Sequence, residues 1–397
     1  MIVKDGAATL RRCLASVRSV VDRIVIGDTG SADGTVEIAR EFCADVFSIP
    51  WEGNFSSARN AVLRHSSCDW VLVLDADEML DVEGAAALVK LVQQPGPAAY
   101  NVWRWNYVLS TNCRSGEHGA FLNPGVLPES SAYPAYVRSL NTRLFRRHPD
   151  VYFERPVHET IAQRLSALQL PVATAPFVIH HFGQAEDQES ARRQKNELYQ
   201  RIGSEYLQQN PSDARTCFEL GLGQLEHFRD AEAALRLFLR ALDLDQKDAN
   251  SLIFVGVCLV RLKRYAEAVE VLTHALHMDS RSTVLHEALG DAYFHQGQHR
   301  NALAAYTASL YAGSASALTL AKRGVCQIYI GQREGGLGAL KEAIAKEPDF
   351  AELIDISVAG TALAQENELA ANLAQKRLTM PEASTCKAPK NTRLLSF

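Results

Sequence analysis

Two apolar stretches that each end in acidic residues decide the fold of the N-terminal half. They read IVIGDTGSADGT over residues 24–35 and DWVLVLDADEML over residues 69–80. In each stretch, a short run of aliphatic residues suited to a buried strand is followed at once by polar and acidic residues. Amphipathic helical patterns lie between the two stretches and after the second. This alternation predicts an α/β domain with a largely parallel sheet.

The alternation extends over the first 94 residues. Short apolar runs take turns with longer amphipathic stretches, which is the pattern of strands connected by helices. We expect strands at 24–27, 46–49 and 70–74, and helices at 7–20, 34–43, 56–66 and 83–94.

Residues 98–181 are less regular and richer in aromatic residues. Trp103, Trp105 and Tyr107 alternate with polar residues, so they share one face of an expected strand. That face suits core packing, and lining an acceptor cleft is the alternative. The stretch 110–135 is rich in Ser, Gly, Pro and Asn, which suits either an active-site lid or a disordered loop.

Acidic residues stand at the ends of two expected strands. Asp28 follows the first strand, and Asp75 and Asp77 follow the strand at 70–74. Ligands of open α/β sheets bind beyond the carboxyl ends of the strands. Residues i and i+2 of an extended chain face the same way, so Asp75 and Asp77 can converge on a Mg²⁺ or Mn²⁺ ion that holds a diphosphate. The alternative is a solvated turn whose acids cap a helix.

The order of three segments within 60 residues is more specific than any one of them. IVIGDTGSADGT, FSSARNAVL (residues 55–63) and DWVLVLDADEML together resemble the nucleotide-sugar-binding half of glycosyltransferase family 2, which has the GT-A fold. The resemblance is strongest to a subgroup with M-I-V-K-N-E at its start and D-T-G-S-x-D-G-T at a strand end. This subgroup includes bacterial enzymes that glycosylate peptides, including at cysteine, and others that act on surface polysaccharide. Asp5-Gly6 stands where the subgroup has Asn-Glu.

The resemblance implies a nucleotide-sugar site. Asp28 would contact the base, expected to be uracil, with Val3 of the first strand beside it. Arg59 and Asn60 would approach the base and diphosphate. Asp75 would lie near the ribose and metal, and Asp77 would bind Mn²⁺ or Mg²⁺. From the residues alone, Asp28 could instead cap the helix near Gly34, and Arg59 could form an ordinary surface ion pair.

The resemblance also implies a general base and a further metal ligand. Family 2 places an acidic base about 80–100 residues after the aspartate pair, where this chain has Pro156-Val157-His158-Glu159. We expect Glu159 to be the base, with His158 as its neighbour or substitute. A surface salt bridge from Glu159 to Arg155 or Arg164 is the alternative. In His180-His181-Phe182-Gly183, His181 matches the metal-binding position better than His180.

The first strand is short for this fold. Met1-Ile2-Val3 gives three residues where a strand in the middle of the GT-A sheet usually needs about five. We therefore expect either that the true start lies upstream or that the first strand is shortened and the base pocket beside it incomplete.

The C-terminal half repeats with a period of 34 residues, which is the period of the tetratricopeptide helix–turn–helix unit. Small residues are expected where paired helices cross closely, and a column of larger residues fills the space between units. Four aligned columns carry the period: Gly256, Gly290 and Gly324; Ala234, Ala268, Ala302 and Gly336; Phe238, Leu272, Tyr306 and Leu340; Ala241, Ala275, Ser309 and Ala343.

These patterns predict the domain layout. We expect a GT-A domain at 1–184, a helical connector at 185–212, a tetratricopeptide-repeat solenoid at 213–376 and a mobile tail at 377–397. Four repeats fill 213–348, and 350–376 forms a terminal helix or half-repeat.

Composition excludes several classes. The 397 residues are 47% hydrophobic and 22% charged, which rules out disorder throughout the chain. The net charge of −5 argues against nucleic acid as a partner. Apolar runs are far too short to span a bilayer, and the first residues lack a signal-peptide pattern. The eight cysteines form no C-x-x-C pair, so we expect free thiols in the cytoplasm.

The sequence thus predicts a metal-dependent, inverting glycosyltransferase of hexosyltransferase type. Its donor would be a UDP-sugar, and its acceptor a peptide or protein held by the repeats, which also allow a homodimer. One alternative is a transferase of polysaccharide or lipid-linked glycan assembly. Another is a repeat-based binding scaffold with a degenerate transferase domain.

Overall fold

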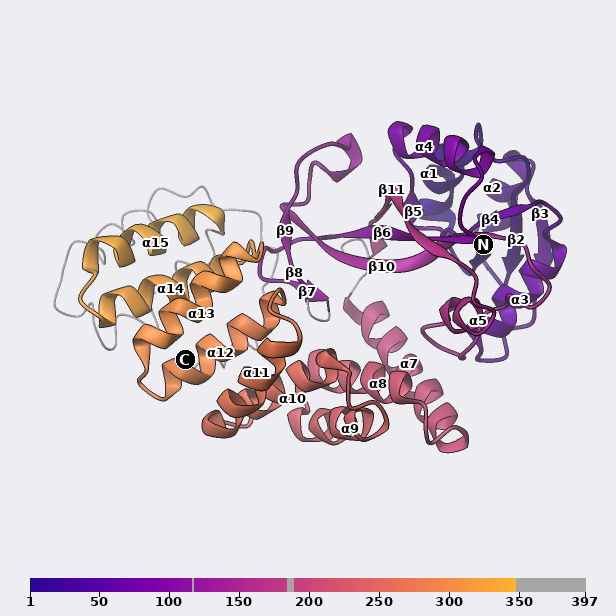
Figure 1. The fold of residues 1–397 in the computed structure, drawn as a ribbon. Helices are drawn as coiled ribbons and strands as arrows, with labels where there is room; N and C mark the ends of the chain where they lie inside the picture. The colour runs from indigo at the N-terminus through magenta and orange to yellow at the C-terminus, as the bar shows by residue number, and fades with distance from the viewer. Residues whose placement is uncertain (116–117, 184–188, 348–397) are drawn as a thin grey trace. The chain divides into compact units, whose positions relative to one another are not determined.

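A computed structural model describes residues 1–115, 118–183 and 189–347, so the terminal helix expected at 350–376 and the tail lie outside the described residues. The chain divides into two compact units (Figure 1). Unit 1 contains Met1–Leu109 and Asn123–Arg229. Unit 2 contains Ser110–Leu122 and the chain from Asp230 onward.

Unit 1 begins with a three-stranded parallel sheet in the order β1-β2-β3. The strands are β1 (Ile2–Val3), β2 (Val25–Asp28) and β3 (Asp45–Ser48), and the helices between them are α1 (Ala7–Val17) and α2 (Thr35–Glu41). The first strand is short, as expected, but it lies at the end of this strand order and not in the middle. With two residues it pairs with β2, and the pairing sets Val3 beside Asp28.

A second sheet in unit 1 has the order β4-β10-β6-β11-β5. This sheet is mixed: its long strands β6 and β10 pair antiparallel, whereas the first sheet is parallel throughout. β11 runs parallel to β6, while β4 and β5 pair antiparallel with their neighbours. The strands are β4 (Trp70–Leu72), β5 (Glu78–Met79), β6 (Ala99–Val108), β10 (Ala135–Arg146) and β11 (Val172–His181); the helices are α3 (Phe55–His65), α4 (Val82–Gln93) and α5 (Ala162–Ala167).

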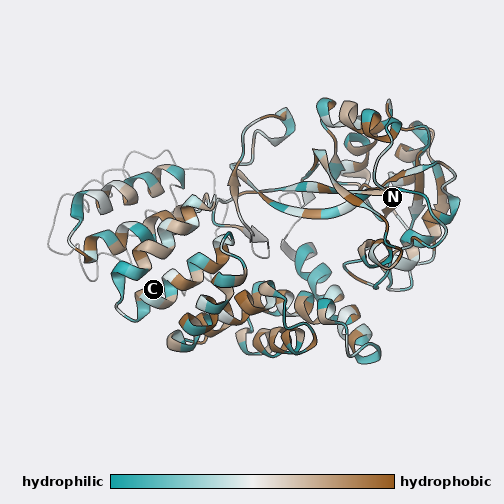
Figure 2. Ribbon diagram, in the orientation of Figure 1, coloured by the Kyte–Doolittle hydropathy of each residue, from teal (hydrophilic) through white to brown (hydrophobic). Residues whose placement is uncertain are grey.

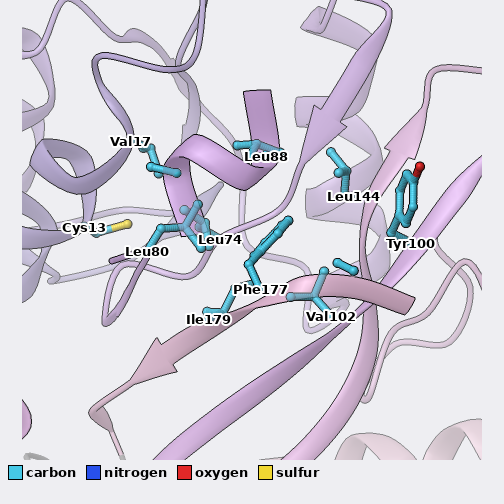
Figure 3. Close-up of a cluster of buried hydrophobic side chains, with 12 residues drawn as sticks. Cys13, Val17, Leu74, Leu80, Leu88, Tyr100, Val102, Leu144, Phe177 and Ile179 are labelled. Atoms are coloured by element: carbon cyan, nitrogen blue, oxygen red, sulfur yellow. The ribbon is translucent and has the colours of Figure 1, made fainter. Parts of the chain in front are cut away.

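One hydrophobic cluster holds the acidic stretch at 75–78 in place. Figure 3 shows Leu74 and Leu80, which flank that stretch, packed with Phe177 and Ile179 of β11. Val17 of α1, Leu88 of α4 and Val102 of β6 complete the contacts. Because apolar residues on both sides of the acidic turn are buried, the turn itself is fixed at the sheet edge.

The aromatic face of β6 packs in the interior of unit 1. Tyr107 is fully buried and hydrogen-bonded to His180 at 2.9 Å, and Trp105 stacks on Tyr136 with ring centroids 4.2 Å apart. Core packing, the first of the two interpretations, therefore describes this face.

The expected connector is a helix that packs on the next helix. α7 (Glu189–Gln209) is followed by α8 (Ala214–Glu226), and both belong to unit 1. The glycines allow close approach: a Cβ on Gly203 would lie 2.9 Å from Leu220, and one on Gly223 would overlap Gln200. Figure 2 shows the polar character of α7. We expected the repeat domain to begin at residue 213, whereas the contacts place α8 with the α/β residues.

Unit 2 is built from helix pairs that match the 34-residue period. Two glycines of the first column meet a large residue of the next helix: Gly256 faces Leu272, and Gly290 faces Tyr306. The third, Gly324, lies against Gly336 and Ala339. Ala268 and Ala302 are fully buried between helices. The helices are α9 (Ala231–Leu244), α10 (Ala249–Arg261), α11 (Tyr265–Met278), α12 (Thr283–His295), α13 (His299–Tyr311), α14 (Ala317–Tyr329) and α15 (Arg333–Lys346).

The 110–122 segment, which leaves the sheet after β6, is part of unit 2. It includes β7 (Arg114–Ser115), β8 (His118–Gly119) and β9 (Phe121–Leu122). The side-chain oxygen of Asn112 accepts a hydrogen bond from the Leu318 backbone N–H at 2.9 Å, and its amide donates to the Glu347 carboxylate at 2.6 Å. This part of the stretch 110–135 is therefore neither a free lid nor a disordered loop where the structure describes it.

No described helix combines the length and the apolar character needed to cross a bilayer.

Replacing Gly290 by Ala should destabilise the helical unit. The new Cβ would lie 2.4 Å from the Tyr306 ring, so the helices must separate, at a cost of about 1–3 kcal/mol. Gly338→Ala is the matched control, because a Cβ there meets nothing within 4 Å. The higher helix propensity of Ala should raise the free energy of unfolding of this variant by about 0.5–1 kcal/mol. Urea denaturation followed by circular dichroism measures both, and equal midpoints for the two variants would contradict the close crossing.

Candidate active site

Two carboxylates hold the loop after β2, one from the end of β2 and one from the loop after β1. Asp28 is buried and accepts hydrogen bonds from the backbone N–H groups of Gly30 and Ser31, all at 3.2 Å. It therefore closes a turn and does not cap α2. Asp5, at a φ of 51°, accepts from the Ala32 N–H at 2.7 Å. Like the Asn of the similar subgroup, Asp5 tolerates a left-handed backbone, and its carboxylate fixes this loop.

Val3 links this loop to the acidic stretch after β4. Its backbone oxygen accepts from the Thr29 N–H at 2.9 Å. A Cβ on Gly6 would lie 2.7 Å from the Val3 side chain and 3.3 Å from Ala76. The expected base-binding pair Val3 and Asp28 is therefore adjacent to the Asp75–Asp77 turn.

Arg59 of α3 joins two of the expected site residues. Its guanidinium donates to Asp75 at 2.7 Å and to Glu159 at 2.5 Å. The side chain of Arg59 is only 10% exposed, so its ion pairs are not ordinary surface pairs. Glu159 pairs with Arg59, whereas Arg155 pairs with Asp213 and Arg164 donates to the Asp150 backbone oxygen. Arg59, Asp75 and Glu159 thus form one contact group across three separate segments.

Three residues that sequence reasoning missed complete this group. Glu78 is fully buried and accepts from Arg104 and from Arg143, both at 3.1 Å, and from the Asp75 backbone N–H at 2.8 Å. Arg143 also donates to Asp75 at 3.2 Å. The alternation of β6 carried a usable signal, because a strand that packs Trp105 and Tyr107 on one face must present Arg104 and Asn106 on the other.

Charge pairing controls the ionisation of the cluster. Burial alone would raise the pKa of Asp75, but the positive charges of Arg59 and Arg143 outweigh it and hold the pKa well below the ordinary 3.8. Burial likewise opposes the charge of Arg59, and the carboxylates of Asp75 and Glu159 raise the pKa of Arg59 above its usual range. The charges of Asp75 and Arg59 therefore stabilise each other in the buried cluster.

Asp77 and His181 form a second pair beside this cluster. The Nε2 atom of His181 lies 3.2 Å from a carboxylate oxygen of Asp77, and Nδ1 lies 2.7 Å from the Asn106 side-chain oxygen. The Asn106 amide donates to the Val137 backbone oxygen at 3.0 Å, which turns its oxygen toward the imidazole. Nδ1 must then carry a proton. Nε2 therefore presents to Asp77 its lone pair in the neutral imidazole, or an N–H group in the doubly protonated one.

The space around this pair is kept open by Gly183. A Cβ on Gly183 would lie 2.0 Å from the Asp77 carboxylate and 3.0 Å from Nε2 of His181. Burial would raise the pKa of Asp77, but the contact with His181 lowers it overall, with a further contribution from Lys195. Among the described residues, no three or more His, Cys, Asp and Glu side chains gather into a complete metal-ligand set. Asp77 and His181 therefore offer two ligands.

Two expected site residues point elsewhere. The Asn60 amide makes two hydrogen bonds to the backbone of Phe153, at 2.8 and 2.9 Å, so it fixes that segment. His158 has a φ of 51°, and its Nδ1 lies 3.9 Å from Glu219 of α8. It lines a small pocket between residues 155–158 and helices α7 and α8. His158 is thus not one of the residues that bond to Asp75 or to Arg59 in the part of the chain described.

Asp75→Asn should destabilise the protein at neutral pH by about 1–3 kcal/mol, because the amide removes one of the two carboxylates that bond to Arg59 and one of the two that bond to Arg143. The folded-state pKa of Asp75 lies below its unfolded value, so this contribution is complete above about pH 4 and is lost as the pH falls below 3.8. Urea denaturation should show the same gap between wild type and variant at pH 7 and 5 and a narrower gap at pH 3.5. A gap that is constant over this range would contradict the charge pairing.

Comparisons with known proteins find related sequences for part of the chain. The sequence profile described as glycosyl transferase family 2 matches residues 1–153. A TPR repeat-containing protein of Synechococcus elongatus is 36% identical over 242 residues, which cover 59% of this chain and 54% of that protein. Glycosyltransferase SunS of the Bacillus subtilis SPbeta prophage is 26% identical over 161 residues, covering 40% of this chain and 33% of SunS. The chain therefore spans about half, or less, of these curated relatives.

Solved structures with some likeness contain helical repeats. They include MamA, with a TM-score of 0.36 and 18% identity over 42% of this chain and 98% of that one. A TPR protein of Thermus thermophilus has a TM-score of 0.35 and 16% identity over 48% of this chain and 94% of that one. These scores are too low to carry an argument, so the repeat assignment rests on the 34-residue period and on the helix pairs. The acid-bearing strand ends and the profile match lead to one conclusion: residues 1–153 belong to glycosyltransferase family 2, and tetratricopeptide repeats follow that domain in the chain.

Proposed function

We propose that the protein is an inverting glycosyltransferase that moves a hexose from a UDP-sugar to a peptide or protein side chain. The observation that carries the proposal is the contact of Arg59 with both Asp75 and Glu159, beside the Asp77–His181 pair. It brings a candidate donor-binding acid and a candidate base to one place. A scaffold with a degenerate transferase domain would have no need to keep these charges buried together.

The donor would bind along the edge formed by β1, β2 and the 75–78 turn. Val3 and Asp28 are adjacent there and suit a nucleobase, with the carboxylate of Asp28 as acceptor for a base N–H. Asp75 is held ionised by arginines and suits hydrogen bonding to ribose hydroxyl groups.

The residues present fit a divalent cation. Asp77 supplies a hard carboxylate oxygen and His181 an imidazole nitrogen, and Gly183 leaves their open side free of a side chain. Mg²⁺ and Mn²⁺ are commonly bound by one or two protein groups, with substrate phosphates and water filling the remaining positions. When bound, the ion would offset charge on the departing diphosphate.

Glu159 would act as the general base. The acceptor oxygen or sulfur forms a bond to the anomeric carbon while the bond from that carbon to the diphosphate oxygen breaks, and the acceptor proton passes to Glu159. Attack opposite to the leaving group inverts the anomeric centre. Arg59 orients the carboxylate through its bond to Oε1 of Glu159. His158, the alternative base, faces the α7–α8 pocket and so is the weaker candidate.

The repeats would hold the acceptor. Solenoids of helix pairs present extended surfaces suited to peptides. The same surfaces could join two copies of the chain, and we place the reaction in the cytoplasm because the cysteines are free where described.

Binding of UDP should depend on Mn²⁺ through Asp77. Isothermal calorimetry with UDP should give a tighter Kd with Mn²⁺ than with EDTA for the wild type, and Asp77→Ala should abolish the difference. Gly183→Ala should weaken the Mn²⁺-dependent part because its Cβ would displace the carboxylate. Gly338→Ala, with open space around it, is the control. Equal UDP affinity with and without Mn²⁺ in the wild type would remove the metal from the proposal.

Glu159→Gln should separate binding from chemistry. We expect UDP affinity close to that of the wild type and a loss of about 10²–10⁴-fold in the rate of UDP release from UDP-sugars, since the amide takes no proton. His158→Gln is the matched variant and should keep most of the rate. If Glu159→Gln retains the wild-type rate while His158→Gln loses it, the base is His158.

A further inference from the structure

Backbone hydrogen bonds close the 154–160 loop, which carries the candidate base. The Glu154 N–H donates to the Thr160 backbone oxygen at 2.9 Å, and the Thr160 N–H donates back to the Glu154 oxygen at 3.2 Å. The backbone oxygen of Pro156 accepts from the N–H of Phe55, the first residue of α3, at 2.8 Å. The loop is therefore closed on itself and attached to the N-terminal end of α3.

Two residues of this loop have a left-handed backbone. The φ angles are 71° at Arg155 and 51° at His158, a conformation that residues other than glycine rarely adopt. Such strain persists only where surrounding contacts hold the backbone in place. The Tyr199 ring of α7 packs edge-on against His158, with centroids 5.6 Å apart, and against Phe55 at 5.4 Å. α7 therefore supports one of the two strained positions, and Arg155 needs a support of its own.

The start of α8 supplies the support for Arg155. The Nε atom of Arg155 donates to a carboxylate oxygen of Asp213 at 2.9 Å, and the Arg155 side chain is only 6% exposed. The other carboxylate oxygen of Asp213 caps α8, because it accepts from the Thr216 backbone N–H at 2.9 Å. Burial would raise the pKa of Asp213, but the bonds from Arg155 and from the Thr216 backbone hold it below the ordinary 3.8. Asp213 therefore joins the strained Arg155 to a helix end through an ion pair.

We propose that Asp213 is a positioning residue for sugar transfer, because it holds Arg155 and through it the 154–160 loop. The loop in turn keeps the Glu159 carboxylate at its bond to Arg59. This inference rests on the proposed function, in which Glu159 takes the acceptor proton. Displacing a catalytic group by about 1 Å can cost about 100-fold in rate. Asp213 acts on the reaction through Arg155, from a helix that lies outside the family match.

Asp213→Asn tests the role of this carboxylate. In either orientation the amide can accept only one of the two bonds, from Arg155 or from the α8 backbone, because its NH₂ group faces the other donor. We expect the amide hydrogens of Glu154 and Thr160 to exchange with deuterium about 10-fold faster or more, as measured by NMR. The kcat of UDP release from UDP-sugars should fall by about 10- to 100-fold, whereas the Kd of UDP in calorimetry should not change.

Two further variants separate the ion pair from the helix cap. Asp230→Asn is the matched control, since Asp230 caps α9 in the same way, accepting from the Ala233 N–H at 2.8 Å, and it should leave exchange and kcat unchanged. Arg155→Gln leaves the α8 cap intact and should reproduce both effects. The double variant should lose no more than either single one, because both remove the same bond. If Asp213→Asn does not fold, Arg155→Gln decides alone.

The outcomes separate this inference from the proposed function. Wild-type exchange and kcat in Asp213→Asn and Arg155→Gln would overturn the role of Asp213 while leaving Glu159 as the base. Either effect without the other, additive losses in the double variant, or an equal loss in Asp230→Asn would also overturn it. Weaker UDP binding in Asp213→Asn would indicate a general disturbance and count against it as well. If the wild type releases UDP from no UDP-sugar, the proposed function fails, and the positioning of its base fails with it.

Discussion

The bridge that Arg59 makes between Asp75 and Glu159 is the constraint on which the site depends. The two carboxylates come from the turn after β4 and from the loop before α5, and they lie 84 positions apart in the chain. A buried guanidinium is tolerated only where carboxylates surround it. α3 must therefore sit where both segments can reach it, and the Asn60 amide, bonded to the Phe153 backbone, holds the second segment at that distance.

The second sheet extends this constraint to the rest of unit 1. β6 and β10 deliver Arg104 and Arg143 from the same face, and Glu78 receives both. The result is an internally neutral set of charges, which costs less to bury than any of its members would alone. Asp77 remains outside it, facing His181. The fold thus separates a charge-matched part that fixes geometry from a smaller part that is open to a ligand.

The sequence predicted much of this and missed the rest for identifiable reasons. Alternating apolar and amphipathic stretches predicted the elements of the first 94 residues within a few positions, and the 34-residue period predicted the helix pairs. The antiparallel pairing of β6 with β10 was not predicted, because the irregular stretch at 98–181 gives no periodicity to read. Glu78 and Arg143 were missed because local patterns say nothing about which charges meet across strands. We expected His158 to act beside Glu159, but the backbone at His158 is left-handed and its imidazole faces Glu219 of α8.

Neither unit is a single run of chain. The 110–122 segment leaves the α/β residues, bonds to Leu318 and Glu347, and returns before β10 begins. During synthesis this segment emerges about 200 residues before its helical partners. Its hydrogen-bonding groups are therefore hydrated, or bonded to temporary partners, until those helices are made. A cut between the transferase and the repeats would likewise leave this segment on the fragment that lacks its helical partners. Neither compact unit can therefore be cut out as one continuous stretch of the chain.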